Sequence, residues 1–181
     1  QCTGKADNQK ATTSGQASGE LTGMKIAYVE IDTLLAQYNF CIDLNEGMVK
    51  KSENVRLTLN QKARELDKQK QDFQTKYQNN AYLSPERAQQ EYNRIAKLEQ
   101  DLQTLSNKLQ SELMSENEKN SLQLRDSINA FLKEYNKTKG YSMIISNTGF
   151  DNLLYADSIY NITKEIVEGL NARYSSPAPK K

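Results

Sequence analysis

Histidine and cysteine, two of the side chains most used in enzymatic chemistry, are nearly missing from this sequence. It has no histidine, and its two cysteines, Cys2 and Cys41, stand far apart in the chain. A structural zinc site, a Cys-His dyad and a Ser-His-Asp triad need side chains that this composition does not provide. Asp and Glu are plentiful, but on polar helices they more often form a solvated face than a catalytic pair. We therefore predict that the protein is not an enzyme and has no catalytic residues, metal, cofactor or small-molecule substrate.

Cys2 stands at the head of a polar segment of small residues that has too few apolar side chains to fold. We predict a disordered tether over residues 1–23. A cysteine in front of such a tether resembles the mature end of a bacterial lipoprotein, although Gln1 precedes it here. That resemblance implies lipidation of Cys2 and attachment to a membrane. The other interpretation is an incidental cysteine in a disordered tail, while Cys41 is expected to pack as a small hydrophobe.

A second group of side chains could form contacts rather than perform chemistry. Apolar and aromatic residues gather in a short part of the chain and exceed what the seam between two helices needs. One interpretation is that they face a binding partner, and the other is that they only close the end of a hairpin. The residues predicted to bind are Phe73, Tyr77, Tyr82, Leu83 and Tyr92.

Overall charge argues against some classes of partner. The chain has 24 basic and 23 acidic side chains, a formal net charge of +1, and no basic run longer than the pairs Lys50-Lys51 and Lys180-Lys181. A net charge so close to zero provides no field that would attract nucleic acid, so no nucleic-acid partner is expected. No apolar stretch is long enough to span a membrane, and no signal peptide is expected in the sequence.

The elements that must position the aromatic group are two long helices. No glycine lies between Met48 and Lys139, and Pro85 is the only proline there. Asn79 and Asn80 are expected to end one helix, and Ser84 can cap the next with Pro85 in its first turn. We predict an antiparallel coiled-coil arm over residues 40–139, about 60 Å long, with its tip near 80–85.

The spacing of apolar residues supports the same fold point. Leu59, Leu66 and Phe73 recur every seventh residue on the first helix, which is typical of a coiled-coil seam. In an antiparallel pair, facing residues share one midpoint in the numbering. Residue 84 is that midpoint for Phe73 with Ile95, Leu66 with Leu102, Leu59 with Leu109, Val55 with Leu113 and Leu44 with Leu124. A plain solvated spacer would show the same pattern.

The segments that flank the arm predict a small α+β head from residues 24–39 and 140–172. Residues 24–32 and 141–146 are rich in β-branched and aromatic side chains and are expected to pair as strands. Residues 152–156 are expected to form a third strand or edge, and residues 162–172 a helix capped by Asp157 or Asn161, followed by a disordered tail over 173–181. So small a head buries little core and leaves strand edges open, which favours oligomerisation. The predicted oligomerisation residues are Ile26, Tyr28, Val29, Ile31, Met143, Ile144, Ile145, Leu154, Tyr155, Ile162 and Ile166.

Taken together, the segment Lys25 to Asp32, the long charged hairpin, Leu154-Tyr155-Ala156-Asp157 and the closing Leu170-Asn171 resemble the Skp (OmpH) family of periplasmic chaperones. The resemblance covers about residues 24–172. It implies a mostly helical α+β homotrimer in the periplasm of a Gram-negative bacterium, with three arms that project from a small β body. It also implies that unfolded outer-membrane proteins are held between the arms without ATP. The near-neutral charge and the cysteine-headed tether depart from the basic, soluble pattern of that family.

Two hypotheses from different classes follow. The first is an ATP-independent holdase whose flexible arms make many weak contacts with a client that has no fixed shape. The second is a lipid-tethered structural coiled-coil trimer that spaces or scaffolds envelope components. Suppression of the aggregation of an unfolded β-barrel protein would distinguish them.

Overall fold

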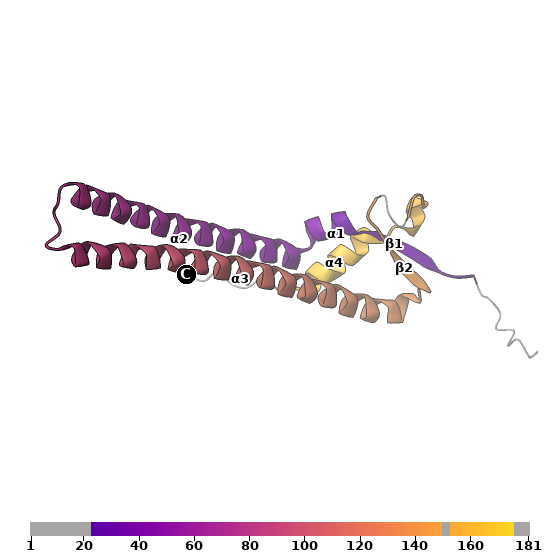
Figure 1. The fold of residues 1–181 in the computed structure, drawn as a ribbon. Helices are drawn as coiled ribbons and strands as arrows, with labels where there is room; N and C mark the ends of the chain where they lie inside the picture. The colour runs from indigo at the N-terminus through magenta and orange to yellow at the C-terminus, as the bar shows by residue number, and fades with distance from the viewer. Residues whose placement is uncertain (1–22, 150–152, 176–181) are drawn as a thin grey trace, which may run out of the picture.

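A long helical arm and a small α/β head make up the fold (Figure 1). The computed structural model describes residues 23–149 and 153–175. Figure 1 shows the two longest helices side by side, with all other elements gathered at one end. In chain order the elements are β1 (Ile26–Glu30), α1 (Ile31–Gln37), α2 (Asn39–Gln78), α3 (Pro85–Lys139), β2 (Met143–Asn147), the 3-10 helix η1 (Ser158–Tyr160) and α4 (Thr163–Arg173).

The turn of the arm lies where the proline and the two asparagines predict it. Helix α2 ends at Gln78, and Asn80 adopts a left-handed conformation with φ 48°, which asparagine tolerates better than most residues. Helix α3 begins at Pro85, and Oγ of Ser84 accepts a hydrogen bond from the Arg87 amide at 3.3 Å. The far end of α3 is closed by Gly140 in the left-handed region, with φ 67°.

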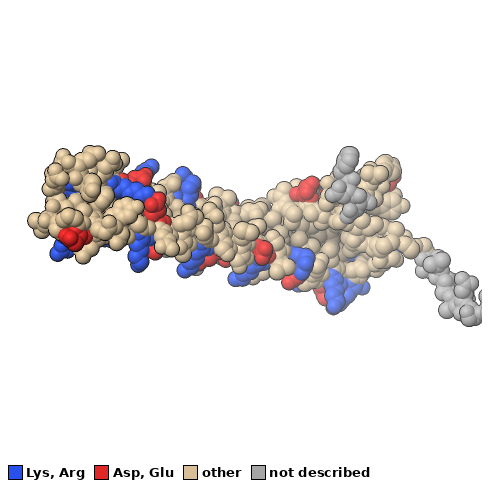
Figure 2. Space-filling model, in the orientation of Figure 1, with Lys and Arg blue, Asp and Glu red and all other residues tan. Residues whose placement is uncertain are grey.

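A single apolar seam holds α2 and α3 together. Leu66 and Ile95 are buried in it, and Leu59 and Leu102 are half-buried. Charged side chains flank the seam and pair across it, as between Lys70 and Glu99 at 2.7 Å. These ion pairs are largely exposed, so each contributes at most about 1 kcal/mol. On the face shown in Figure 2, basic and acidic side chains intermingle along the arm without a large patch of one sign.

The sheet of the head has two parallel strands among the described residues. Strand β1 pairs with β2 from Ile26 opposite Met143 to Glu30 opposite Asn147. Parallel pairing requires a crossover connection, and here the whole arm is that connection. Residues 153–156, part of the segment expected to form a third strand, have no strand conformation. Instead, the amide of Ile162 donates to the Tyr28 carbonyl at 3.1 Å, so the residues before α4 extend the sheet briefly.

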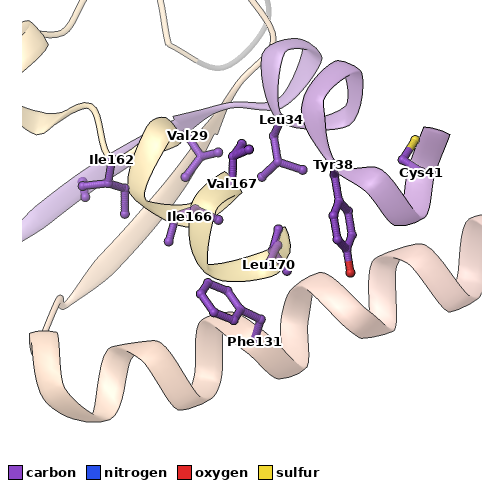
Figure 3. Close-up of a cluster of buried hydrophobic side chains, with 10 residues drawn as sticks. Val29, Leu34, Tyr38, Cys41, Phe131, Ile162, Ile166, Val167 and Leu170 are labelled. Atoms are coloured by element: carbon purple, nitrogen blue, oxygen red, sulfur yellow. The ribbon is translucent and has the colours of Figure 1, made fainter. Parts of the chain in front are cut away.

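The hydrophobic core lies in the head, where α4 packs between α1 and α3 (Figures 1 and 3). Ile166 and Leu170 of α4 are fully buried, together with Leu34 of α1. Figure 3 shows these side chains converging with Val29 of β1 and Phe131 of α3. The arm therefore depends on its one seam, whereas the head has elements packed on several sides.

Helix α1 was not expected from the sequence, which favoured a strand through Asp32 and assigned no element to residues 33–39. The strand ends at Glu30, and Ile31 starts the seven-residue helix. Tyr38 then interrupts the helical path in an extended conformation, with φ −78° and ψ 113°. At the other end of the chain, α4 runs to Arg173 and Tyr174 packs against Phe40, so the ordered head extends into the segment expected as a tail.

Candidate functional site

An aromatic cluster caps the arm on both sides of its turn, and Phe73 is its centre. The Phe73 ring lies 5.9 Å from that of Tyr77, 5.6 Å from that of Tyr82 and 6.2 Å from that of Tyr92, measured between ring centroids. These separations are within the range of favourable aromatic pairs. The turn and the first helical turns of α3 thus bring together four of the five predicted binding residues.

The members of this cluster differ in exposure. Phe73 and Tyr82 are half-buried, so they serve to close the end of the arm. Tyr77 is 63% exposed, Tyr92 is 57% exposed, and Leu83 is 96% exposed. A leucine that the fold leaves so open contributes little to holding the tip together. Phe73 and Tyr82 therefore pack within the tip, whereas the other three side chains present apolar surface to solvent. We name these three residues, Tyr77, Leu83 and Tyr92, the tip trio.

A shallow groove lies beside Tyr77 and Leu83 of the tip trio. It has a volume of about 360 Å³ and is lined by apolar and small polar residues, namely Tyr77, Asn80, Tyr82, Leu83, Ser84, Pro85 and Ala88. Its openness to solvent and lack of a charged lining suit an extended apolar segment better than a small polar ligand.

One ion pair lies beside the tip, between Arg94 and Glu91 of α3. The Arg94 guanidinium contacts the Glu91 carboxylate at 2.6 Å and the Gln69 side-chain oxygen at 2.7 Å. The hydrogen bond from Arg94 lowers the pKa of Glu91, so this carboxylate stays ionised at neutral pH. The guanidinium also bridges α3 to α2 through its contact with Gln69.

The predicted oligomerisation residues fall into three sets by burial. Tyr28, Val29, Ile162 and Ile166 are buried within the chain itself. Ile26, Ile31, Ile144 and Ile145 are half-buried, whereas Met143, Leu154 and Tyr155 are exposed. Side chains of the first set are already packed in the head, so their role in the single chain is to form its core. Only the side chains of the exposed set remain free of the core and available for contact with a second chain.

Two further exposed apolar residues of the head were missed from the sequence. Ile159 is 76% exposed and Tyr160 is 47% exposed in the 3-10 turn that follows Leu154 and Tyr155. The Asp157 carboxylate accepts from the Ile159 amide at 3.0 Å and holds this turn outward. The sequence predicts a cap for the last helix from Asp157 or Asn161: Asp157 caps this turn instead, and the Asn161 side-chain oxygen accepts from the Thr163 amide at the start of α4, at 3.0 Å.

Within residues 23–149 and 153–175, the structure forms no candidate metal centre. No group of three or more His, Cys, Asp or Glu side chains is arranged to hold a metal ion in this part of the chain. Burial raises the pKa of the Cys41 thiol, which therefore remains protonated at neutral pH. Cys2, the predicted lipidation site, lies outside the described residues. None of the described helices is both long and apolar enough to cross a membrane.

Comparison with known proteins agrees with this architecture. A crystal structure from Caulobacter crescentus, of a proposed outer membrane chaperone (OmpH-like), superposes with a TM-score of 0.75. The alignment covers 94% of this chain and 95% of the other at 13% sequence identity, so it shows a shared fold. No curated protein sequence matches the chain. Residues 25–170 match the outer membrane protein (OmpH-like) family, which spans the head and the whole arm. The chain therefore belongs to the OmpH-like outer membrane protein family.

Proposed function

We propose that this protein is an ATP-independent holdase chaperone for unfolded outer-membrane proteins. The observation that carries the proposal is the tip trio, three large apolar side chains that the fold leaves exposed at the end of an arm about 60 Å long. A soluble protein seldom keeps such side chains exposed together unless they meet a partner. The family and the fold of its Caulobacter crescentus relative support a chaperone role, and with it a location in the periplasm of a Gram-negative bacterium.

Weak contacts suit this kind of client. An unfolded β-barrel protein exposes apolar segments in many places and has no fixed surface for a single tight site. Each exposed aromatic or leucine side chain contributes about 1 to 3 kcal/mol when it is fully buried by a partner. Several arms that enclose one client multiply such contacts, because the first contact raises the effective concentration for the next.

Assembly into a homotrimer would supply those arms. We propose that Met143, Leu154 and Tyr155 of the head, with Ile159 and Tyr160 beside them, form the contact between chains. Lipidation of Cys2 would tether the trimer to a membrane. The proposed trimer rests on the exposed apolar surface of the head, and the proposed lipidation rests on the sequence of the tether.

The test is a comparison of aggregation in the absence of ATP. A β-barrel outer-membrane protein is diluted from urea with a stoichiometric amount of the assembled protein, and light scattering is followed. We expect the wild-type chain to suppress scattering. We expect the variant with Tyr77→Ser, Leu83→Ser and Tyr92→Ser to lose most of this effect, because it lacks the exposed apolar surface that would contact the client. Its arm should stay folded, since Phe73 and the leucine seam still close it.

A matched control removes the same number of exposed apolar side chains from the shaft of the arm, with Val49→Ser, Leu57→Ser and Leu122→Ser. This variant should suppress aggregation about as well as the wild type. If neither the wild type nor the control suppresses aggregation, the proposal fails and the structural coiled-coil scaffold becomes the better hypothesis. Full suppression by the tip variant would mean that the tip trio does not bind the client.

A further inference from the structure

The break between α1 and α2 has no local cause in the sequence. No glycine or proline occurs from Ile31 to Glu46, and Tyr38, which precedes α2, makes no capping hydrogen bond with its side chain. Tyr38 itself keeps its helical hydrogen bonds on both sides of the break: its amide donates to the Leu34 carbonyl, and its carbonyl accepts from the Ile42 amide. Local propensity alone would allow one helix from Ile31 into the arm.

Asn171, on α4, bonds to two of the backbone groups that the break leaves without a partner inside a helix. Its side-chain oxygen accepts from the Asn39 amide at 2.8 Å, and its side-chain nitrogen donates to the Gln37 carbonyl at 2.9 Å. In an uninterrupted helix both of these backbone groups would bond within the helix. The one amide side chain therefore satisfies the end of α1 and the start of α2 together.

Neighbouring contacts hold the same bend from other sides. The Tyr38 ring is buried and points from the break toward α3, as Figure 3 shows, and its hydroxyl lies 2.8 Å from that of Ser127. Tyr174, which follows α4, donates to the Asp43 carboxylate at 2.9 Å and packs on Phe40. The C-terminal end of α4 thus contacts the first two turns of the arm at several points.

We infer that Asn171 is a positioning residue, which holds the bend at Tyr38 and thereby fixes where, and in which direction, the arm helix α2 leaves the head. The inference rests on the proposed holdase function in one respect: the direction of the arms sets the space in which a client is held. Without the Asn171 amide, the bend leaves one backbone donor and one acceptor unpaired. A straighter α1–α2 helix, which pairs both internally, then gains population.

The experiment measures the bend directly in the full-length chain. Spin labels are placed on α1 at Asp32→Cys and on α2 at Lys62→Cys, two exposed positions, with Cys2→Ser and Cys41→Ser as background. Labelled chains are diluted into unlabelled chains before assembly, and the distance distribution is recorded. We expect one narrow distance in the unmodified Asn171 background. We expect Asn171→Ala to add a longer population that approaches the roughly 45 Å of an uninterrupted helix.

Asn136 provides a matched control in the same head. Its side chain also makes two hydrogen bonds to backbone groups, both of Tyr141, at 2.7 Å and 2.9 Å. Asn136→Ala should leave the distance distribution unchanged. An unchanged distribution with Asn171→Ala, or the same shift with Asn136→Ala, would overturn the inference. If Asn171→Ala does not fold, Asn171→Asp, which keeps the acceptor for Asn39, is measured in its place and should shift the distribution in the same direction.

The link to client holding is tested separately, with the tip left intact. We expect Asn171→Ala to hold an unfolded β-barrel protein about tenfold more weakly than the wild type, because misdirected arms lower the effective concentration between them. A shifted distance with unchanged holding would overturn this link. Failure of the wild type to hold any client would instead count against the proposed function, and the distance measurement would still decide the role of Asn171.

Discussion

Tyr174 joins the end of α4 to the arm through its hydroxyl group. The hydroxyl donates to the Asp43 carboxylate, and its ring packs against Phe40 at 5.0 Å between centroids. Burial, and then the hydrogen bond to Asp43, raise the pKa of Tyr174 to about 12. The folded protein therefore holds this proton more tightly than the unfolded chain, in which a tyrosine has its ordinary pKa of 10.0.

We predict that the stability contributed by the Tyr174 hydroxyl depends on pH. It is fully present below pH 10 and is lost as the pH rises through about 12, where the folded state also gives up the proton. At pH 8, Tyr174→Phe should lower the free energy of unfolding by about 1 to 2 kcal/mol. Urea denaturation of both chains from pH 8 to pH 12 should show this difference shrinking toward zero.

Tyr77→Phe is the control for that series, because Tyr77 lies exposed at the other end of the arm. It should unfold like the wild type at pH 8. A difference between Tyr174→Phe and wild type that stays constant up to pH 12 would mean that the Asp43 hydrogen bond is not the source of the stability.

At the scale of the helices, two glycines in helical positions have opposite meanings. Gly169 of α4 faces the Phe131 ring so closely that an added Cβ would collide with the ring's outer carbons. Gly47 of α2 is exposed, and a Cβ added there would meet nothing within 4 Å. The first glycine allows α4 to approach α3, whereas the second has no packing reason in the single chain.

We therefore predict opposite effects of the same substitution at these two positions. Gly169→Ala should destabilise the head by about 1 to 3 kcal/mol, because Phe131 must move out of the core. Gly47→Ala should stabilise α2 by up to about 1 kcal/mol, since alanine is the better helix former. Thermal or urea unfolding of the two variants measures both effects, and a stabilised Gly169→Ala variant would contradict the packing argument.

The pairing of the two long helices allows a covalent test. Leu66 and Leu102 line the same hollow of the seam, so cysteines at these two positions should join within one chain under mild oxidation. Leu66 with Leu109 serves as a mismatched pair, about two helical turns away, and should stay reduced. Denaturing electrophoresis with the native cysteines replaced would show the result, and products formed only between chains would contradict the antiparallel register.

The whole molecule combines a thin arm with a head of small size. All residues of the main core cluster belong to the head or to the ends of the arm helices beside it. A head this small buries a limited apolar area by itself, yet Leu154 and Tyr155 remain 86% and 84% exposed on it. Exposed apolar side chains of this kind are expected where one subunit of an oligomer contacts another.

We predict that assembly depends on this exposed surface rather than on the buried strand residues. Leu154→Asp with Tyr155→Asp should give a folded monomer, because both side chains point into solvent in the single chain. Val29→Asp should unfold the head instead, since it places a carboxylate in the core. Light scattering coupled to chromatography, with circular dichroism, distinguishes these outcomes.

Leu57→Asp with Leu122→Asp adds the same charge to exposed positions on the arm and should leave assembly unchanged. An oligomer that survives the double change at Leu154 and Tyr155 would place the contact between chains elsewhere on the molecule.

Most of the arm could be predicted from the amino-acid sequence. Three of its four helix ends are marked locally: α2 ends before Asn79, α3 begins at Pro85, and α3 ends before Gly140. Capping and helix breaking are local properties of a few neighbouring residues. The seam between the helices also follows from the sequence, since apolar residues that recur every seventh position have one way to pair across a short turn. The aromatic group at the tip could be located for the same reason, but its division into packed and exposed members could not.

Only the tertiary structure decided the head. The bend at Tyr38 depends on Asn171, more than 130 positions away, and nothing in the local sequence marks it. Val29, Ile162 and Ile166 read as candidates for contact between chains, yet α4 folds over the sheet and buries them within one chain. Burial and bending of this kind arise from contacts between distant segments, whose free energies no local pattern of residues contains.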